Sequence, residues 1–100
     1  MTVQKNTDGN KITFNVAGRL DTTTSPDFEK EIKDSVTDNI SEVNIDMKEL
    51  EYISSSGLRV LLSLHKMMMA KNGSLLILNP NEIVLEVFEV TGFSDILTIQ

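Results

Sequence analysis

The sequence predicts an α/β domain with a mixed sheet of four to five strands and helices packed on it. Its 100 residues are enough for one hydrophobic core and too few for two, so we expect residues 1–100 to form a single domain. A tight-turn sequence near the start predicts an antiparallel hairpin. After it, segments with strand and helix periodicity alternate along the chain, and such alternation requires parallel strand pairs joined by right-handed crossovers.

The opening hairpin is predicted from a turn sequence between two short apolar segments. Val3 lies in the first segment, and residues Thr7–Asn10 that follow it accept the positive φ angles of a tight turn. In the second segment Ile12, Phe14 and Val16 alternate with polar residues. One face of this second strand should therefore be more buried than the other.

The first helix is expected to begin at a serine-proline pair. Proline lacks the amide that would be unpaired at a first helical position, so Ser25 is predicted as the N-cap and Pro26 as the first helical residue. We expect the helix to run to about Asp38. Apolar residues recur at every fourth position and predict its buried stripe: Phe28, Ile32 and Val36.

A third strand and a second helix are predicted in the middle of the chain. Apolar and polar residues alternate around Ile45, which indicates a strand. The helix that follows is amphipathic and should end at Asn72 and Gly73. Its apolar residues fall within an arc of roughly 160°, which predicts the buried side: Leu58, Leu61, Leu62, Leu64, His65, Met68 and Met69.

The last elements are another strand, a third helix and a short final strand. Leu75–Leu78 is a continuous apolar run, so we expect a strand buried on both faces and central in the sheet. Residues 79–81 offer caps for the third helix, which Gly92 should end. A short strand is expected at residues 97–99.

Composition excludes several classes of function. The formal charge of −6 disfavours binding to nucleic acid and to anionic membrane surfaces. The chain has no cysteine, so disulfides and thiolate metal sites are absent. No apolar stretch approaches the roughly 20 residues that cross a bilayer, so we expect no membrane insertion. Without a signal-peptide pattern at the start, a cytoplasmic protein is expected.

The stretch "EYISSSGLRVLL" (residues 51–62) places three serines where the third strand meets the second helix. Loops at the carboxyl ends of parallel strands usually hold ligand sites. A nucleophile elbow centred on Ser55 would need a glycine where Ile53 stands. The one histidine, His65, would lie roughly 15 Å farther along the same helix, too far for proton transfer. We therefore predict that the protein is not an enzyme.

Two other roles remain for the serines. Serine is common at a helix N-cap, so at least one of Ser54, Ser55 and Ser56 is expected to cap the helix. A second hydroxyl on the first turn would face solvent beside free amides and the positive end of the helix dipole. That environment accepts an added phosphate without unfolding. Phosphorylation would add about 1.5 to 2 negative charges and could act as a switch.

The serine stretch, the preceding "VNIDMKELE" (residues 43–51) and the earlier "VAGRLDTTTS" (residues 16–25) resemble the anti-sigma factor antagonists, the family built on the STAS domain. The match covers nearly the whole chain. The resemblance implies a STAS-like fold and partner switching. The unphosphorylated domain binds an anti-sigma factor that is also a serine kinase, phosphorylation of one serine releases it, and a serine phosphatase resets the cycle.

The resemblance implies Ser55 as the phosphorylated residue, with Ser54 and Ser56 as alternatives. Many family members have aspartate where Ser54 stands, so kinase recognition could differ here, or Ser54 could cap the helix and leave Ser55 free. Asp21 matches a residue that the family keeps near its phosphorylation site. It is expected either to contact the partner or to tighten its loop by accepting from the amides at residues 23 or 24.

The partner surface is predicted around the start of the second helix. Gly57, lacking a side chain, should let a partner's backbone approach, and Val60 with Met67 should form an exposed apolar strip beyond Ser63. Besides Asp21, the residues predicted to contact the partner are Ser54, Ser55, Ser56, Gly57, Arg59, Val60, Ser63 and Met67.

A second function remains open from the sequence. The same domain could be a STAS-type binding subunit of a signalling or lipid-transport complex that is never phosphorylated. The serine at position 54, where many family members have aspartate, favours this alternative. Neither function requires a cofactor. A magnesium site is not expected, because Asp21 and Asp46 lack a third clustered acid.

Overall fold

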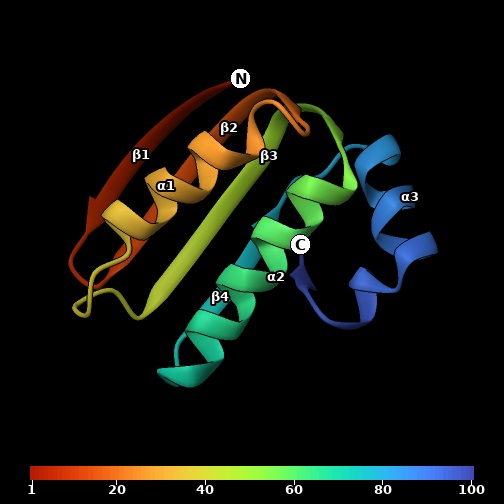
Figure 1. Cartoon of the computed structure of the whole chain (residues 1–100). Coiled ribbons are helices and arrows are strands. Elements are labelled where there is room, and N and C mark those ends of the chain that lie inside the picture. Colours follow the sequence, from red (N-terminus) through yellow and green to blue (C-terminus); the bar gives the residue numbers. More distant parts are fainter.

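The computed structural model describes residues 1–100 as a five-stranded mixed sheet with three α-helices (Figure 1). The fold class predicted from the sequence is confirmed. In chain order the elements are β1 (Thr2–Asp8), β2 (Lys11–Leu20), α1 (Ser25–Ser35), β3 (Glu42–Ile53), α2 (Ser55–Ala70), β4 (Ser74–Leu78), α3 (Glu82–Thr91), a 3₁₀ turn (Phe93–Asp95) and β5 (Thr98–Ile99).

The strands lie side by side in the order of the sequence, β1-β2-β3-β4-β5. β1 and β2 form the predicted antiparallel hairpin, and all later neighbours are parallel. Right-handed crossovers that always step in one direction leave their helices on one face of the sheet. α1 and α2 cover that face, and α3 lies on the β4 and β5 side of α2 (Figure 1).

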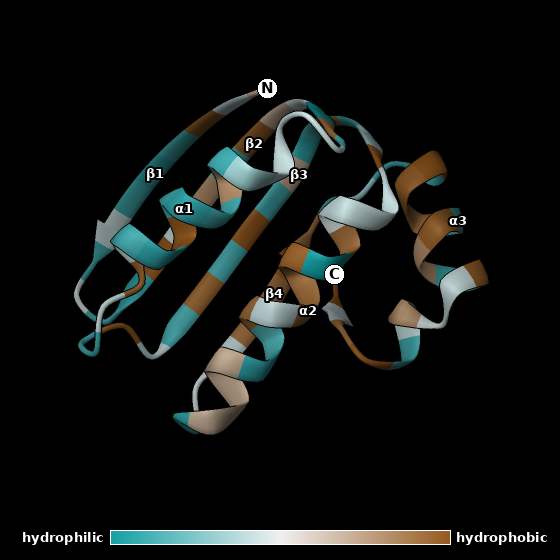
Figure 2. Ribbon diagram, in the orientation of Figure 1, coloured by the Kyte–Doolittle hydropathy of each residue, from teal (hydrophilic) through white to brown (hydrophobic).

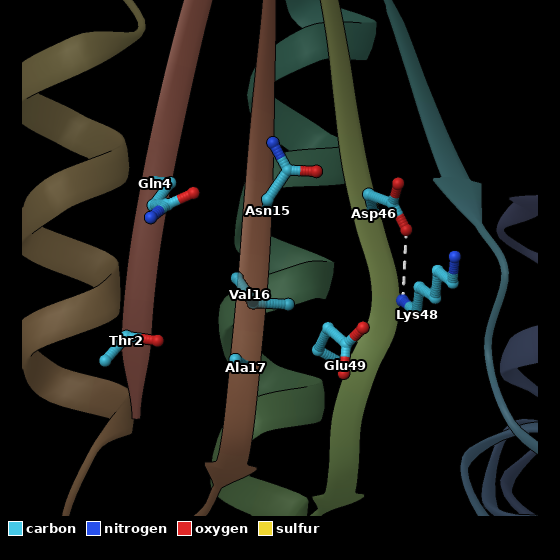
Figure 3. Close-up of a pocket in the computed structure, with 8 residues that line it drawn as sticks. All are labelled: Thr2, Gln4, Asn15, Val16, Ala17, Asp46, Lys48 and Glu49. Carbon is cyan, nitrogen blue, oxygen red and sulfur yellow. Dashed lines mark hydrogen bonds between the residues drawn. The ribbon is translucent and has the colours of Figure 1, made fainter.

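The core fills the space between the sheet and the helices. Ile12, Phe14 and Val16 of β2 are buried there, as the alternation in the sequence predicts. Phe14 meets Phe28 of α1 edge to face, with ring centroids 6.1 Å apart, an arrangement favourable for aromatic pairs. The other face of the sheet carries polar side chains such as Asn15 and is not covered by helices (Figure 3).

This open face corrects the prediction for β4. Leu75 and Ile77 are buried, but Leu76 and Leu78 are only half-buried, because no helix covers the side to which they point. β4 is also not the central strand. β3 occupies that position, and β4 has only the two residues of β5 beyond it.

The boundaries of α1 and the burial of α2 differ from the predictions as well. Thr24, not Ser25, is the N-cap of α1, because the Ser25 amide and hydroxyl both donate to the Asp21 carbonyl and the turn begins one residue early. α1 ends at Ser35, where the chain turns to bury Ile40. Met69, predicted to be buried, is 62% exposed on the last turn of α2. None of the three helices has the length and apolarity needed to cross a membrane.

Candidate functional site

The serine segment lies at the edge where the parallel strands end, beside the loop that leaves β2. Ile53, the last residue of β3, pairs with Leu20, the last residue of β2. The Ser54 amide then donates to the Leu20 carbonyl at 2.9 Å. This bond fixes the start of α2 against the loop that contains Asp21, as the sequence predicts for strands that run parallel.

Ser54 is the N-cap of α2. Its backbone is extended, with φ −100° and ψ 177°, and its Oγ accepts a hydrogen bond from the Gly57 amide at 3.4 Å. Its carbonyl accepts the first intrahelical bond, from the Leu58 amide at 3.0 Å. The expectation that one of the three serines caps the helix is therefore confirmed. The serine that caps the helix is Ser54.

Replacing Ser54 by alanine should lower the free energy of unfolding by about 0.5 to 1 kcal/mol, near the lower end of the range for lost caps because the 3.4 Å bond is long. Urea unfolding followed by circular dichroism measures the change. Ser55→Ala is the matched control and should change stability by less than about 0.5 kcal/mol, because that side chain is exposed. Equal losses in the two variants would contradict the assignment of the cap to Ser54.

Ser55 and Ser56 have different surroundings. Ser56 is half-buried, and its Oγ lies 3.3 Å from Oγ1 of Thr22 in the β2–α1 loop. Ser55, the first residue of α2, is exposed, and its hydroxyl makes no hydrogen bond within the chain. Of the three serines, Ser55 is the one whose hydroxyl is free to react or to contact another molecule.

Asp21 organises its own loop. Its Oδ1 accepts from the Thr23 amide at 3.0 Å, the Thr23 hydroxyl at 2.7 Å and the Thr24 amide at 3.2 Å. Arg19 lies nearby, with its Nε 3.7 Å from Asp21 Oδ2 and its guanidinium 4.4 Å from the centroid of the Tyr52 ring. The loop-tightening role predicted for Asp21 is confirmed, and contact with a partner stays a prediction.

These bonds predict a pH dependence. The hydrogen bond from the Thr23 hydroxyl is the main cause that lowers the pKa of Asp21 below its ordinary value of 3.8, and the Thr23 and Thr24 amides add to it. A carboxylate with a lowered pKa stabilises the folded state above its ordinary pKa, and the contribution is lost as pH falls through the lowered value. Asp21→Ala should therefore cost stability at pH 7, and the cost should shrink below about pH 4.

The comparison of wild type with Asp21→Ala is made by thermal unfolding in a series of buffers from neutral to acidic pH. Asp38→Ala is the control, since Asp38 is exposed. If the difference between wild type and Asp21→Ala were the same at pH 7 and at pH 3, the ionised carboxylate would not be what holds the loop.

Gly57 does not serve a partner in the way the sequence suggested. It is buried, and a Cβ on it would lie 2.8 Å from Leu20 Cγ and 2.8 Å from Ile53 Cγ1. The close backbone approach that glycine permits here is to the Leu20 carbonyl of the same chain, 3.0 Å from that Cβ. The expectation that Gly57 makes room for a partner's backbone is wrong, because β2 already occupies the space, and a partner contact at Gly57 stays a prediction without this support.

The predicted apolar strip on α2 is also wrong. Val60 is 6% exposed, because α1 packs against that side of α2. Met67 is half-buried against the core. The exposed side of α2 is instead polar and carries Ser55, Arg59, Ser63 and Lys66, which we call the α2 ridge. Ser55, Arg59 and Ser63 follow one another at intervals of four residues and so lie on one side of the helix.

A groove of about 340 Å³ runs beside the α2 ridge where α1 and α2 begin. Pro26 and Glu29 of α1 line it together with Ser56, Arg59 and Val60 of α2, so a partner contact at Val60 stays a prediction although the residue is largely buried. The sequence prediction missed the two α1 residues and Lys66 as part of this surface. The helical periodicity of α1 indicates that Glu29 is outside the buried stripe, but only the packing of α1 beside α2 brings it to the groove.

A model of the STAS domain matches residues 2–100. The chain belongs to the STAS-domain family. It is 30% identical over 90 residues to an anti-sigma-B factor antagonist of Bacillus subtilis (strain 168), a match that covers 90% of this chain and 82% of that protein. The resemblance identified from the sequence is confirmed.

Solved structures with the same fold include the anti-sigma factor antagonist SpoIIAA in its unphosphorylated form. The TM-score is 0.86 at 19% identity, with 99% of this chain and 88% of that chain covered. The Bacillus cell fate determinant SpoIIAA in the phosphorylated form matches with a TM-score of 0.78 at 18% identity, with 99% and 91% covered. At these identities the likeness shows that the fold is shared.

The largest hollow of this STAS domain lies elsewhere. About 400 Å³ in volume, it is on the open face of the sheet, on the side opposite the helices (Figure 3), and none of the three serines lines it. Asp46 in this hollow accepts from the Lys48 amide at 3.0 Å and from Asn79 Nδ2 at 3.3 Å. Asp46 pairs with Asn15 in mid-strand, roughly 20 Å from Asp21 at the end of β2, so the two carboxylates do not share a site.

No group of three or more histidine, cysteine, aspartate or glutamate residues in the STAS domain is placed to hold a metal ion. Ser55 and His65 both lie on α2 and are separated by roughly 15 Å along its axis, as expected for ten helical residues. The two side chains do not form a nucleophile–base pair. His65 is therefore out of reach of the Ser55 hydroxyl.

Proposed function

We propose that this STAS domain is an anti-sigma factor antagonist that works by partner switching. The unphosphorylated domain binds an anti-sigma factor with serine kinase activity, and phosphorylation of Ser55 releases it. The observation that carries the proposal is the exposed Ser55 hydroxyl, which makes no hydrogen bond within the chain and stands on the first turn of α2. The 30% identity to the anti-sigma-B factor antagonist of Bacillus subtilis (strain 168) supports the same role.

The surroundings of the three serines favour Ser55 as the phosphorylated residue. Ser54 Oγ is occupied as the cap of α2, and Ser56 is half-buried against Thr22. A kinase needs a hydroxyl that can reach its nucleotide, and Ser55 meets this need without local unfolding. The α2 ridge, Asp21 and the groove beside α1 supply the surface that the partner would cover.

Phosphorylation should release the partner without unfolding the domain. A dianionic phosphate at the start of α2 gains about 0.3 to 1 kcal/mol from the helix dipole in the free domain. In the complex it would lose its water against a surface that fits a neutral hydroxyl, at a cost of several kcal/mol unless a cation meets it. Since each 1.4 kcal/mol is about tenfold in affinity, dissociation is favoured. A serine phosphatase would restore the binding form.

The experiment that tests the proposal is phosphorylation by purified serine-kinase anti-sigma factors of the source organism. The domain is incubated with each kinase and ATP, and its intact mass is measured. Wild type, Ser54→Ala and Ser56→Ala should gain one phosphate, and Ser55→Ala should gain none. Loss of the phosphate in Ser54→Ala or Ser56→Ala instead would move the site to that residue.

The second candidate function is a STAS-type binding subunit of a signalling or lipid-transport complex that is never phosphorylated. The first turn of α2 carries no acidic residue, so a kinase that recognises the family's aspartate finds none here. Under this function no kinase adds mass to the wild-type chain, although the chain still binds its partner. Both functions describe a cytoplasmic binding protein and not an enzyme.

A further inference from the structure

The outer side of α3 exposes large apolar side chains. Ile83 is 58% exposed and Val90 is 76% exposed, and Val87 between them is half-buried. These three residues, which we call the α3 apolar ridge, fall within about 60° of one another around the helix. The inner side of α3 is made of Val84 and Phe88, which are fully buried. Figure 2 shows α3 as largely hydrophobic along its length.

Ile83 and Val90 contribute little to the core of this chain, whereas Val87 packs partly against it. A helix at the surface of a domain usually has polar or charged residues opposite its buried face. Valine and isoleucine are also poorer helix formers than lysine, glutamate or alanine, because their β-branched side chains lose rotamers in a helix. Ile83 and Val90 therefore bring a cost in helix propensity and in solubility that little burial offsets in this chain.

An acidic ridge lies directly beside the apolar one. Glu82, Glu86 and Glu89 are exposed and occupy the adjacent 60° of the helix surface. None of them is in a salt bridge. The chain has no lysine or arginine after Lys71, whereas residues 72–100 contain four acidic residues. The negative charge of α3 is thus not balanced by the local sequence.

We propose that the outer face of α3 is a docking surface for a basic amphipathic helix of a partner protein. The apolar side of such a helix would cover Ile83, Val87 and Val90, and lysine or arginine along its flank would pair with Glu82, Glu86 and Glu89. Helix recognition of this kind uses apolar anchors at helical spacing, and complementary charge sets the orientation. This surface is on α3, not on the α2 ridge, so the inference does not depend on phosphorylation of Ser55.

Two other occupants fit the charge less well. A second copy of the chain would bring its own acidic ridge against this one, and like charges in contact are unfavourable at an interface. An anionic lipid surface would likewise be repelled by the glutamates, since membrane-surface helices are rich in lysine and arginine.

The test uses a synthetic amphipathic helical peptide with leucines along one side and lysines and arginines along its flanks. It is titrated into the full chain, labelled with ¹⁵N, and amide chemical shifts are recorded. A scrambled peptide of the same composition and a peptide with glutamate in place of the basic residues are the controls. We expect the largest shifts in residues 82–96 with the amphipathic basic peptide and much smaller ones with either control.

Charge-reversal variants then separate a specific surface from general attraction to an acidic protein. Glu86→Lys should lower the affinity for the basic amphipathic peptide at least about tenfold, which corresponds to 1.4 kcal/mol. Glu49→Lys, the same charge change at an exposed position on the open face of the sheet, should weaken it less than about threefold, the loss expected from net charge alone. Ile83→Ser with Val90→Ser should match the loss of Glu86→Lys, with circular dichroism showing an intact fold.

Three results would overturn the inference. The largest shifts could lie outside α3, the scrambled peptide could bind as well as the amphipathic one, or Glu49→Lys could weaken binding as much as Glu86→Lys. The Ser55→Asp variant should bind the peptide like wild type. The proposed function of Ser55 and the proposed docking surface on α3 are therefore tested independently, and either can be contradicted without affecting the other.

Discussion

Replacing Ser55 by aspartate is expected to lower the affinity of the domain for its anti-sigma factor at least about tenfold and to leave the fold intact. The side chain is exposed on the first turn of α2, so the free domain accommodates a carboxylate beside the unpaired amides of the helix start. In the complex the same carboxylate would be removed from water against a surface that fits a hydroxyl. Titration calorimetry with the purified anti-sigma factor measures the loss.

Matched variants show whether the effect belongs to position 55. Ser55→Ala should lower the affinity by no more than about tenfold and by less than Ser55→Asp, because a buried contact to one small hydroxyl is worth only about 0.5 to 1.5 kcal/mol. Ser63→Asp adds the same charge two turns farther along the α2 ridge and should have a smaller effect, because that position is away from the helix start where the phosphate is proposed to be added. An unchanged affinity for Ser55→Asp, with circular dichroism showing a folded domain, would refute the switch.

The element order was predictable because each element carries its own signal in the sequence. Ile12, Phe14 and Val16 alternate with polar residues on β2, and the turn residues before them set the hairpin. The error at β4 has a different origin. A run of leucines indicates burial, but whether a helix covers the second face depends on the direction of every crossover in the sheet. No local pattern contains that information.

The position of the site along the chain was predictable, but the set of side chains exposed around it was not. The start of a helix after a parallel strand locates Ser55, and its exposure follows once Ser54 takes the cap. Val60 shows what was missing. The helical wheel predicts one buried side for α2. In the structure α2 has two buried sides, one that packs on the sheet and one that packs on α1. Contacts between helices that are distant in sequence cannot be seen in the periodicity of either helix alone.

Gly57 illustrates the same limit and leads to the largest stability effect at the site. Gly57→Ala is expected to lower the free energy of unfolding by about 1 to 3 kcal/mol, the usual cost of overpacking. Its new Cβ would lie 2.8 Å from Leu20 Cγ and from Ile53 Cγ1 and 3.0 Å from the Leu20 carbonyl. Alanine is the better helix former by about 0.8 to 1 kcal/mol, so the two effects oppose each other. We expect the steric cost to exceed this gain, because the carbonyl belongs to the backbone and moves only with β2.

A double-mutant cycle with Leu20 isolates this contact. Urea unfolding of Gly57→Ala should show the loss, and the loss should shrink in a Leu20→Ala background, where the nearest side chain has been shortened. Ser63→Ala, an exposed change on the same helix, serves as the control for helix propensity. If Gly57→Ala were stabilising, the gain in helix propensity would exceed the steric cost. The expected overpacking at the start of α2 would then be contradicted.

The same variant should also weaken partner binding, by a route that differs from that of Ser55→Asp. The added Cβ must push the first turn of α2 away from the end of β2, where the Ser54 amide donates to the Leu20 carbonyl at 2.9 Å. Ser55 sits on that turn, so the surface that the partner covers would be displaced while its charge stays the same. Leu20→Ala removes the contact with Leu20 Cγ but keeps those with Ile53 Cγ1 and the Leu20 carbonyl. Binding lost to Gly57→Ala should therefore return in part with Leu20→Ala, whereas binding lost to Ser55→Asp should not return at all.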